Sequence, residues 1–472
     1  MHLFNILRRV RSRKVLVIGL DCFTPELVFH CWKKDLANLE NLIENSLWGE
    51  LKSTIPAITV PAWTSMITSK DPGVLGIYGF RNRFDYSYDK LCIAMGDAVK
   101  EKRVWNILSD RGFQSIILGV PQTYPIRPLK GYIVSGFLTP NVDCDFTYPS
   151  TFKKEVLHKV PDYAFDVKDF RTDNKDQLLK EIYEMTEKHF FLIEHVLESK
   201  SWDFFMFVEI GIDRIHHGLW HCHDLKHLKY EPGNPYENAI HDYYVEVDKY
   251  IGKLLSKVDD KTAVLVVSDH GAKRMDGGIC VNQWLWQNGY LVFEDDIKID
   301  NITPFDDLKV DWNRTRAWGS GGYYGRIFLN VKDRESQGII PISEYHKVRD
   351  ELAEELQLIP DHKGRDIGTR IFFPDRVYKK VNNIAPDMIV YFGDLYWRSV
   401  GSVGYKNWYT FENDIGPDSC NHAENGLFIL YDPQKKYSWK YEGAHVMDIA
   451  PTILHLMGQR VPGDMQGKVI KE

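Results

Sequence analysis

Three short apolar segments, each with an acidic residue at or just after its end, constrain the fold of this 472-residue chain more than any other feature. They contain Val, Ile, Leu and Phe without alternating polar residues, a pattern typical of strands buried on both faces of a sheet. The predicted strands are Lys14–Asp21, Asp203–Ile210 and Thr262–Ser268, and the second and third are followed by Asp213 and Asp269. Ligands bind outside the carboxyl ends of such strands, so we expect these acids to converge on one crevice.

Helical segments alternate with these strands along the chain. Apolar residues recur at three and four positions, as in amphipathic helices. Helices are predicted at residues 178–199, 240–258, 343–356 and 446–457, and a fourth buried strand at 426–431. The alternation indicates an α/β fold, a doubly wound and mainly parallel sheet with helices on both faces. We predict a core of residues 14–290 and 381–472, interrupted by an inserted cap region at 291–380.

The composition excludes several classes of protein. Lys and Arg number 59 against 66 Asp and Glu, and the net charge of −7 gives no overall attraction to nucleic acid. No segment approaches the roughly 20 apolar residues that span a bilayer. Seven cysteines without a CxxC pair favour reduced thiols over a disulfide framework or a thiolate zinc site. We therefore expect a cytoplasmic protein with no membrane span and no stable nucleic-acid partner.

The N-terminus is basic and precedes the first predicted strand. Its charged residues are Arg8, Arg9, Arg11, Arg13 and Lys14. The apolar run that follows is interrupted by Asp21 and is shorter than a signal-peptide core of roughly 7 to 15 residues. We interpret the five charges as a solvated chain end, although contact with lipid or another partner is the alternative.

Six side chains at or near the strand ends form a candidate metal site. They are Asp21, Asp213, His217, Asp269, His270 and His422. Carboxylates and imidazoles together suit zinc or manganese. Asp213 and His217 are four residues apart, so one helical turn places both on the same face. Six ligands exceed what one catalytic zinc takes from a protein and are about what two neighbouring metals share.

Each of these residues also has an ordinary explanation. An Asp after a strand commonly caps a turn or a helix, and His422 alone fits a loop histidine with satisfied hydrogen bonds. His216, His221 and His223 compete with His217 for a ligand role, and we interpret those three as structural. The joint pattern still favours a metal site, because independent capping acids have no reason to accompany histidines at strand ends.

Thr59 is the candidate nucleophile. It lies in a Pro-containing turn, residues 54–66, just before a predicted helix. Helix N-termini stabilise anions through free N–H groups and the helix dipole, so a phosphoryl oxygen can bind there. Taken alone, the segment favours Thr59 as a helix cap.

Six short motifs occur in a fixed order along the chain. They are Gly19-Leu-Asp21, Thr59-Val-Pro61, Pro72-Gly-Val-Leu-Gly76-Ile, Asp213-Arg-Ile-His-His217, Ser268-Asp-His-Gly271 and His422-Ala-Glu-Asn-Gly426. In this order they resemble the alkaline phosphatase superfamily, most closely its branch of type I phosphodiesterases, nucleotide pyrophosphatases and related phosphohydrolases or phosphomutases. The resemblance covers most of the chain.

The resemblance implies a role for each motif residue. It places Asp21, Thr59, Asp269 and His270 around one divalent metal ion and Asp213, His217 and His422 around a second. The ions are expected to be Zn²⁺, with Mn²⁺ as the alternative. Coordination lowers the pKa of a hydroxyl much as zinc lowers that of water, from 15.7 to about 7, so Thr59 can attack phosphorus and form a phosphothreonine.

One position departs from the family pattern, and the identity of one phosphate donor is left open. Relatives often have a His where this chain has Leu75, so a polar contact from that position is absent. A further donor to the phosphate is commonly an Asn some twenty residues after the nucleophile. Asn82 is the catalytic candidate, with Arg81 as its competitor, and an Asn that only shapes a turn is the alternative.

We therefore predict a metal-dependent hydrolase of phosphodiester or pyrophosphate bonds in a small phosphorylated substrate, nucleotide-like or otherwise. A phosphomonoesterase or phosphomutase of the same superfamily is the alternative, and a non-catalytic binding protein is the alternative from another class. A sulfatase is disfavoured, because Thr59 is not followed by the x-Pro-x-Arg that formylglycine formation needs. The aromatics Trp318, Tyr323, Tyr324, Trp397 and Trp408 either stack on a nucleobase or pack in the interior.

Overall fold

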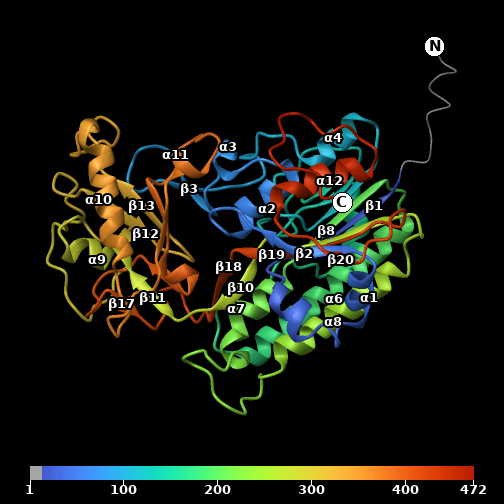
Figure 1. The fold of residues 1–472 in the computed structure, drawn as a ribbon, viewed down its shortest axis with the longest axis horizontal. Coiled ribbons are helices and arrows are strands. Elements are labelled where there is room, and N and C mark those ends of the chain that lie inside the picture. The colour runs from blue at the N-terminus through green and yellow to red at the C-terminus, as the bar shows by residue number, and fades with distance from the viewer. Residues whose placement is uncertain (1–12, 472) are drawn as a thin grey trace.

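A ten-stranded sheet forms the centre of the protein in the computed structural model, which describes residues 13–471 (Figure 1). The strand order is β20-β2-β19-β9-β1-β8-β5-β6-β7, and β21 also pairs with β2. The strands are β1 (Val15–Leu20), β2 (Leu47–Lys52), β5 (Ser115–Leu118), β6 (Gly131–Val134), β7 (Thr147–Tyr148), β8 (Phe204–Glu209), β9 (Ala263–Val267), β19 (Asn425–Tyr431), β20 (Trp439–Lys440) and β21 (Ala444–His445). Strands β1, β5, β6, β8 and β9 are mutually parallel, whereas β19 runs antiparallel to β9 and β2. The predicted doubly wound, mainly parallel sheet is confirmed.

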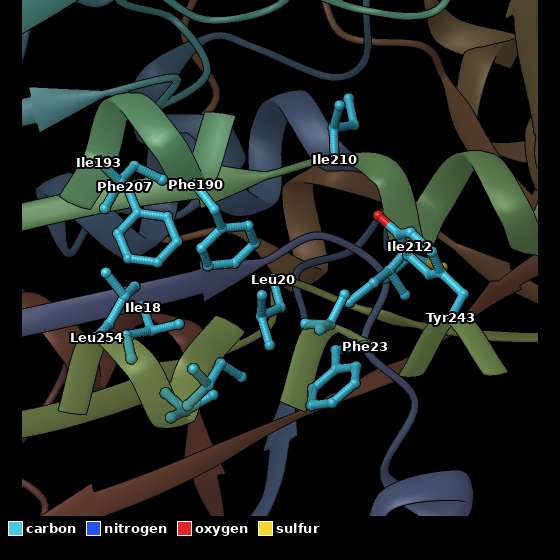
Figure 2. Close-up of a cluster of buried hydrophobic side chains, with 14 of the residues drawn as sticks. Ile18, Leu20, Phe23, Phe190, Ile193, Phe207, Ile210, Ile212, Tyr243 and Leu254 are labelled. Carbon is cyan, nitrogen blue, oxygen red and sulfur yellow. The ribbon is translucent and has the colours of Figure 1, made fainter. Parts of the chain in front are cut away.

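Helices cover both faces of this sheet, because alternate residues of its strands point to opposite sides. Leu16, Ile18 and Leu20 of β1 belong to one apolar cluster, and Val15 and Val17 belong to the other. The first cluster includes α1 (Ala37–Glu44), α5 (Phe152–Lys159), α6 (Lys175–Ser199), α7 (Gly211–His223) and α8 (Ala239–Leu255). The second includes α2 (Thr59–Thr68), α4 (Val104–Asp110) and α12 (Ile449–Leu456). Figure 2 shows the first cluster, where Ile18 and Leu20 lie between Phe207, Phe190 and Leu254.

A second group of elements packs around its own apolar cluster and lies to one side of the central sheet (Figure 1). It contains an antiparallel sheet in the order β12-β13-β15-β14 and a three-stranded sheet in the order β16-β11-β17. Its elements are β11 (Gly277–Cys280), α9 (Val281–Gln287), β12 (Ala317–Ser320), β13 (Gly325–Leu329), α10 (Tyr345–Gln357), β14 (Arg370–Phe372), α11 (Pro374–Val377), β15 (Met388–Tyr391), β16 (Trp397–Val400) and β17 (Tyr409–Thr410). We call residues 277–410 the inserted lobe. It extends beyond the predicted cap region, 291–380, at both ends, and the division into domains stays a prediction.

A two-stranded antiparallel ribbon joins the inserted lobe to the central sheet. It consists of β10 (Gly271–Arg274), which follows β9, and β18 (Cys420–Ala423), which leads into β19. Ala272 pairs with His422 in this ribbon, so His422 lies beside the segment that follows β9. Three other short elements are α3 (Pro72–Leu75), β3 (Arg81–Arg83) and β4 (Leu91–Ile93). The ribbon therefore brings a residue late in the sequence to the carboxyl edge of the sheet.

The structure also bears on the membrane span, the cysteines and the basic N-terminus considered in the sequence analysis. No helix in residues 13–471 combines the length and the apolar character that crossing a membrane requires. All seven cysteines are free thiols. Arg8, Arg9 and Arg11 lie outside the described residues, whereas Arg13 pairs with Asp432 and Lys14 lies 4.7 Å from the ring centre of Trp202.

Candidate metal centre

The six predicted ligands come together at the carboxyl edge of the central sheet. Asp21 follows β1, and Asp269 and His270 follow β9, its neighbour in the sheet. Asp213 and His217 lie on the first two turns of α7, which follows β8 on the other side of β1. His422 reaches the same place on β18. All six side chains are buried.

Asp21, Asp269 and His270 form the first group, with Thr59 beside them. The Nε2 atom of His270 lies 3.2 Å from Asp269 Oδ2, 3.7 Å from Asp21 Oδ1 and 3.2 Å from Thr59 Oγ1. Ligand atoms about 2.1 Å from a tetrahedral metal ion lie about 3.4 Å from one another. The spacing of these four atoms therefore fits a common divalent ion.

Asp213, His217 and His422 form the second group. His217 Nε2 lies 3.3 Å from Asp213 Oδ1 and 3.3 Å from His422 Nε2, and the third separation, between His422 Nε2 and Asp213 Oδ1, is 3.9 Å. These separations again match the edges of a ligand tetrahedron around one ion. The rings of His270 and His422 stack at 3.8 Å, so the two groups adjoin each other.

All three histidines turn Nε2 toward the carboxylates and use Nδ1 elsewhere. Nδ1 lies 2.8 Å from Asp418 Oδ1 in His217, 3.0 Å from the Ala57 carbonyl oxygen in His422 and 3.2 Å from the Gly271 carbonyl oxygen in His270. These partners accept hydrogen bonds, so Nδ1 carries the proton and Nε2 presents a lone pair. Metal-binding histidines have this arrangement.

The three carboxylates of the site are buried close together, an arrangement that a bound cation would stabilise. One oxygen in each of Asp21, Asp213 and Asp269 is buried without a hydrogen-bond partner. Burial raises the pKa of Asp21 well above its usual range, and the Asp213 charge raises it further; burial and then Asp21 do the same to the pKa of Asp269. Unpaired carboxylate oxygens in the interior are costly unless they are protonated or coordinate a metal. The cluster therefore has the donor set and the unsatisfied oxygens that a divalent ion would complete.

A proton and a metal ion compete for Nε2 of each histidine, so the pKa values of the three rings matter. Burial lowers the pKa of His270 to about 4 and also lowers that of His422, which keeps both rings neutral near pH 7. Burial acts in the same direction on His217, but Asp418, Cys420, Tyr323 and Asp213 together outweigh it and raise the pKa of His217 well above its usual range. An ion at Nε2 of His217 therefore competes with a proton.

Thr59 is the first residue of α2, and its hydroxyl faces the first ligand group. The peptide before it is held by Tyr391 of the inserted lobe, whose hydroxyl accepts a hydrogen bond from Ala57 N at 2.8 Å. On the next turn of α2, Trp63 Nε1 donates to Asp21 Oδ2 at 2.7 Å. The helix therefore orients both a ligand carboxylate and the hydroxyl.

The sequence matches one family model, described as type I phosphodiesterase / nucleotide pyrophosphatase, over residues 15–418. The chain belongs to this family. The phosphodiesterase family and the wider alkaline phosphatase superfamily predicted from the motifs are thus confirmed. Members are metal-dependent phosphohydrolases, so the chain is an enzyme of that class. No curated protein sequence matches it significantly.

Several solved structures share the fold of this phosphodiesterase, and their alignments include nearly its whole length. Human ectonucleotide pyrophosphatase/phosphodiesterase 5 is 13% identical with a TM-score of 0.54, and the alignment covers 95% of this chain and 96% of that one. Phosphonoacetate hydrolase from Sinorhizobium meliloti 1021, solved with phosphonoformate, is 14% identical with a TM-score of 0.58 and 95% coverage of both chains. An inactive threonine-to-alanine variant of the murine ectonucleotide enzyme, in complex with AMP, is 13% identical with a TM-score of 0.51 and 96% coverage of both. At these identities the likeness concerns the fold.

Two residues that contact the predicted metal ligands were not predicted from the sequence. Arg214 pairs with the second oxygen of Asp213 at 2.6 Å and with Asp166, also at 2.6 Å. Asp418 hydrogen-bonds His217, as described above. Neither Arg214 nor Asp418 stands at the end of an apolar run, although Arg214 lies inside the motif that contains Asp213 and His217.

Asn82 lies in the hairpin of β3 and β4, and its side chain is used by its own turn. Its Oδ1 atom accepts a hydrogen bond from Tyr78 N at 2.7 Å, and Nδ2 donates to the Gly79 carbonyl oxygen at 3.0 Å. Its competitor, Arg81, is exposed, and Leu75 is buried in α3. The catalytic role of Asn82 stays a prediction, and the geometry supplies a structural role beside it.

Replacing Asn82 by alanine separates the two roles. If the amide only shapes the turn, the variant loses about 1 kcal/mol of stability for each hydrogen bond that is removed, and kcat/KM stays within about threefold of the wild type. A lost phosphate donor would instead lower kcat/KM by about 100-fold or more. Thermal unfolding and steady-state hydrolysis of bis-p-nitrophenyl phosphate distinguish the two results.

The five aromatic residues proposed for base stacking differ in position. Trp318 and Trp397 are buried in the apolar cluster of the inserted lobe. Tyr324 is buried in a separate cluster with Ile58 and Tyr78. Trp408 is half-buried. Tyr323 lies at the cluster itself, with its ring stacked 4.4 Å from that of His422.

The histidines that competed with His217 are not part of either ligand group. His216 Nε2 lies 3.1 Å from the Tyr244 hydroxyl, on the side of α7 that faces α8. His221 and His223 are half-buried near the end of α7. Their interpretation as structural residues stays a prediction.

The turn between β8 and α7 is stabilised by a buried carboxylate, Glu209. Its oxygens accept hydrogen bonds from Gly211 N at 3.0 Å and Thr186 Oγ1 at 3.1 Å, and they pair with His189 Nδ1 at 2.8 Å. Burial lowers the pKa of His189, but the charge of Glu209 and its hydrogen bond, with smaller contributions from Ala164 and Asp166, together outweigh burial and the net shift is upward. The pair therefore holds the turn that places Asp213.

The His189–Glu209 pair should make stability depend on pH. A histidine with a raised pKa in the folded state contributes its full stabilisation below the unfolded value, about 6.5, and loses it as the pH rises through the raised pKa. We expect Glu209→Gln to be less stable than the wild type at pH 6 and to show a smaller loss of stability above pH 6.5. Urea unfolding from pH 6 to 9 measures this, and parallel pH profiles would contradict it.

Proposed function

We propose that this enzyme hydrolyses phosphodiester or pyrophosphate bonds of a small nucleotide-like substrate through a covalent phosphothreonine at Thr59. One observation supports the proposal above all others. The Thr59 hydroxyl lies at the N-terminus of α2, 3.2 Å from His270 Nε2, beside buried carboxylate oxygens that have no other partner. A hydroxyl in that position can be deprotonated by coordination and can attack phosphorus in line.

Different residues would have different roles in such a reaction. Thr59 Oγ1 forms the bond to phosphorus, and the leaving alcohol or phosphate departs on the opposite side. Water then attacks the same phosphorus, breaks its bond to Thr59 Oγ1 and releases the phosphate product with the Thr59 hydroxyl restored. The free N–H groups at the start of α2 stabilise negative charge on the phosphoryl oxygens. Trp63 and Arg214 hold the outer oxygens of Asp21 and Asp213, so the inner oxygens stay directed into the cluster.

We propose two divalent ions, Zn²⁺ or alternatively Mn²⁺, as the cofactors. Asp21, Thr59, Asp269 and His270 would hold one ion, and Asp213, His217 and His422 the other. When bound, the ions lower the pKa of hydroxyl groups and neutralise charge on the reacting phosphate. A set of three carboxylates and three imidazoles is the mixed oxygen and nitrogen environment that both metals accept.

Two structural neighbours support a phosphoryl substrate. The murine ectonucleotide enzyme was solved with AMP as a threonine-to-alanine variant described as inactive, and phosphonoacetate hydrolase was solved with phosphonoformate. A threonine that is essential in a protein of the same fold agrees with the role proposed for Thr59. The cytoplasmic location remains a proposal that rests on the amino-acid sequence.

A phosphomonoesterase or phosphomutase is the second candidate, because the same ligand set serves both reactions. Purified protein, freed of metal and reconstituted with Zn²⁺ or Mn²⁺, should be assayed on bis-p-nitrophenyl phosphate and p-nitrophenyl phosphate. We expect the diester to have the larger kcat/KM. A preference for the monoester would favour the second candidate, and no turnover with either metal would favour a protein that binds without catalysis.

A further inference from the structure

Asp418 lies directly behind His217, on the side away from the predicted metal. Its Oδ1 atom is 2.8 Å from His217 Nδ1, and its side chain is fully buried. Asp418 belongs to the segment between the inserted lobe and β18, while His217 belongs to α7. A carboxylate in this position fixes which ring nitrogen of a histidine carries the proton.

The second oxygen of Asp418 is held by two donors from other segments. Arg171 Nε lies 3.1 Å from Oδ2, and the Tyr323 hydroxyl donates to the same oxygen at 2.8 Å. Arg171 Nη2 in turn donates to the Tyr323 hydroxyl oxygen at 2.7 Å. Oδ2 is thus fully occupied, and Oδ1 is left to accept from His217.

Asp418 is also close enough to His217 and Cys420 for an ion to bind on the Nδ1 side instead. Cys420 Sγ completes this group of three, 3.3 Å from His217 Nδ1. Arg171 adds a positive charge beside this group, whereas the Nε2 side faces unpaired carboxylate oxygens. The Nε2 side is therefore the better cation site.

We propose that Asp418 is a positioning residue that fixes the His217 imidazole with its proton on Nδ1 and its lone pair on Nε2, directed toward Asp213 and His422. Arg171 and Tyr323 orient Asp418 for this task. The inference rests on the metal centre of the proposed function, and it adds that one ion depends on a contact from outside the central sheet.

The replacement Asp418→Asn tests the direction of this hydrogen bond. Arg171 and Tyr323 both donate to the second oxygen, so the amide must turn its oxygen to them and its NH₂ group to His217. Nδ1 of His217 must then accept, which moves the ring proton to Nε2, where it faces Asp213 and blocks the ion. Asp418→Ala leaves space for water and lets Nδ1 keep its proton.

The two variants should therefore rank in opposite order in two measurements. We expect Asp418→Asn to weaken Co²⁺ binding at one of the two sites by about 100-fold and Asp418→Ala by about 10-fold, the range seen when partners of metal-bound histidines are removed. Asp418→Ala should have the lower melting temperature without metal, because it leaves a cavity. Co²⁺ titration of the metal-free proteins, followed by absorbance and calorimetry, and thermal unfolding give both rankings.

Asp387→Asn is the matched control. Asp387 is another buried carboxylate, held by Arg334 at 2.8 Å and by the Tyr345 hydroxyl at 2.8 Å, but it contacts no predicted ligand. It should lose stability while keeping both Co²⁺ affinities. Loss of Co²⁺ binding in step with melting temperature in all three variants would show that Asp418 is only a structural contact and would overturn the inference.

Two further results would also overturn it. The first is a Cys420→Ala variant that binds one ion fewer than the wild type, because the ion would then lie on the Nδ1 side of His217. The second is a wild-type protein that binds no Co²⁺, because His217 would then be no metal ligand. A different result would contradict the proposed function. If the protein binds two ions but does not hydrolyse the diester, the proposed reaction is wrong, while the expected ranking of the Asp418 variants is unaffected.

Discussion

Replacing Thr59 by alanine is expected to lower kcat for bis-p-nitrophenyl phosphate by at least about 1,000-fold while leaving the fold intact. Removing a nucleophile eliminates the covalent route, and what remains comes from binding and electrostatic stabilisation. Thr59→Ser keeps a hydroxyl at the same position and should retain measurable turnover. Acid-quenched wild-type reactions should also yield a peptide phosphorylated at Thr59, detectable by mass spectrometry.

Thr64→Ala is the control for this experiment. Thr64 lies on the same helix and is equally buried, but its hydroxyl donates to the Val60 carbonyl oxygen at 2.6 Å. Its loss should reduce stability by about 1 kcal/mol and leave kcat unchanged. Turnover by Thr59→Ala within tenfold of the wild type would mean that water attacks phosphorus directly, and the phosphothreonine would have to be abandoned.

The central sheet is predictable because its strands are continuous apolar runs. The predicted strand Thr262–Ser268 and the observed β9, Ala263–Val267, differ by one residue at each end, and β1 and β8 agree as closely. The long helices are also predictable, since α6 and α8 each bury one face against the sheet. The parallel direction of these strands then follows from their alternation with helices, whereas the order of the strands in the sheet was not predicted.

The inserted lobe is not predictable in the same way. Its strands are short, such as the three residues of β14, and their apolar residues are interrupted by charged ones. Strand β13 pairs with β15, about 60 residues further along the chain, through irregular segments with no periodic pattern. Only α10 has the length and the apolar spacing that indicate a helix, and it was predicted at residues 343–356.

The ligand residues could be selected from the sequence because each lies within or close to a recognisable element. Asp418 has no such signal. It lies in an irregular segment four residues before His422, and its partner His217 is 201 residues away. Asp418 meets His217 only when the ribbon of β10 and β18 brings the segment between the inserted lobe and β18 against α7. Contacts of this kind depend on tertiary structure, and no local pattern marks them.

The second large effect concerns stability without metal and follows from the unpaired oxygens. Asp269→Asn removes a buried carboxylate whose Oδ2 atom has no partner and which lies beside Asp21. The metal-free variant should be more stable than the metal-free wild type by about 1 to 3 kcal/mol, because an uncompensated buried charge is relieved. The same change should abolish diester hydrolysis and remove one ion from the protein.

Addition of zinc should reverse this ranking. At a free concentration 1,000 times the dissociation constant, each ion that binds only the folded state stabilises it by about 4.1 kcal/mol, which exceeds the advantage of the metal-free variant. The wild type should therefore gain more stability than Asp269→Asn, and the order of their melting temperatures should change.

Asp248→Asn is the control for the reversal. This carboxylate is buried and accepts hydrogen bonds from Asn38 N at 3.1 Å and Leu39 N at 2.8 Å, away from the cluster. Its loss should destabilise the protein both with and without zinc. If Asp269→Asn behaves in the same way, with no gain in the metal-free state, the carboxylates of the cluster are not in conflict with one another and the structural argument for a bound cation is lost.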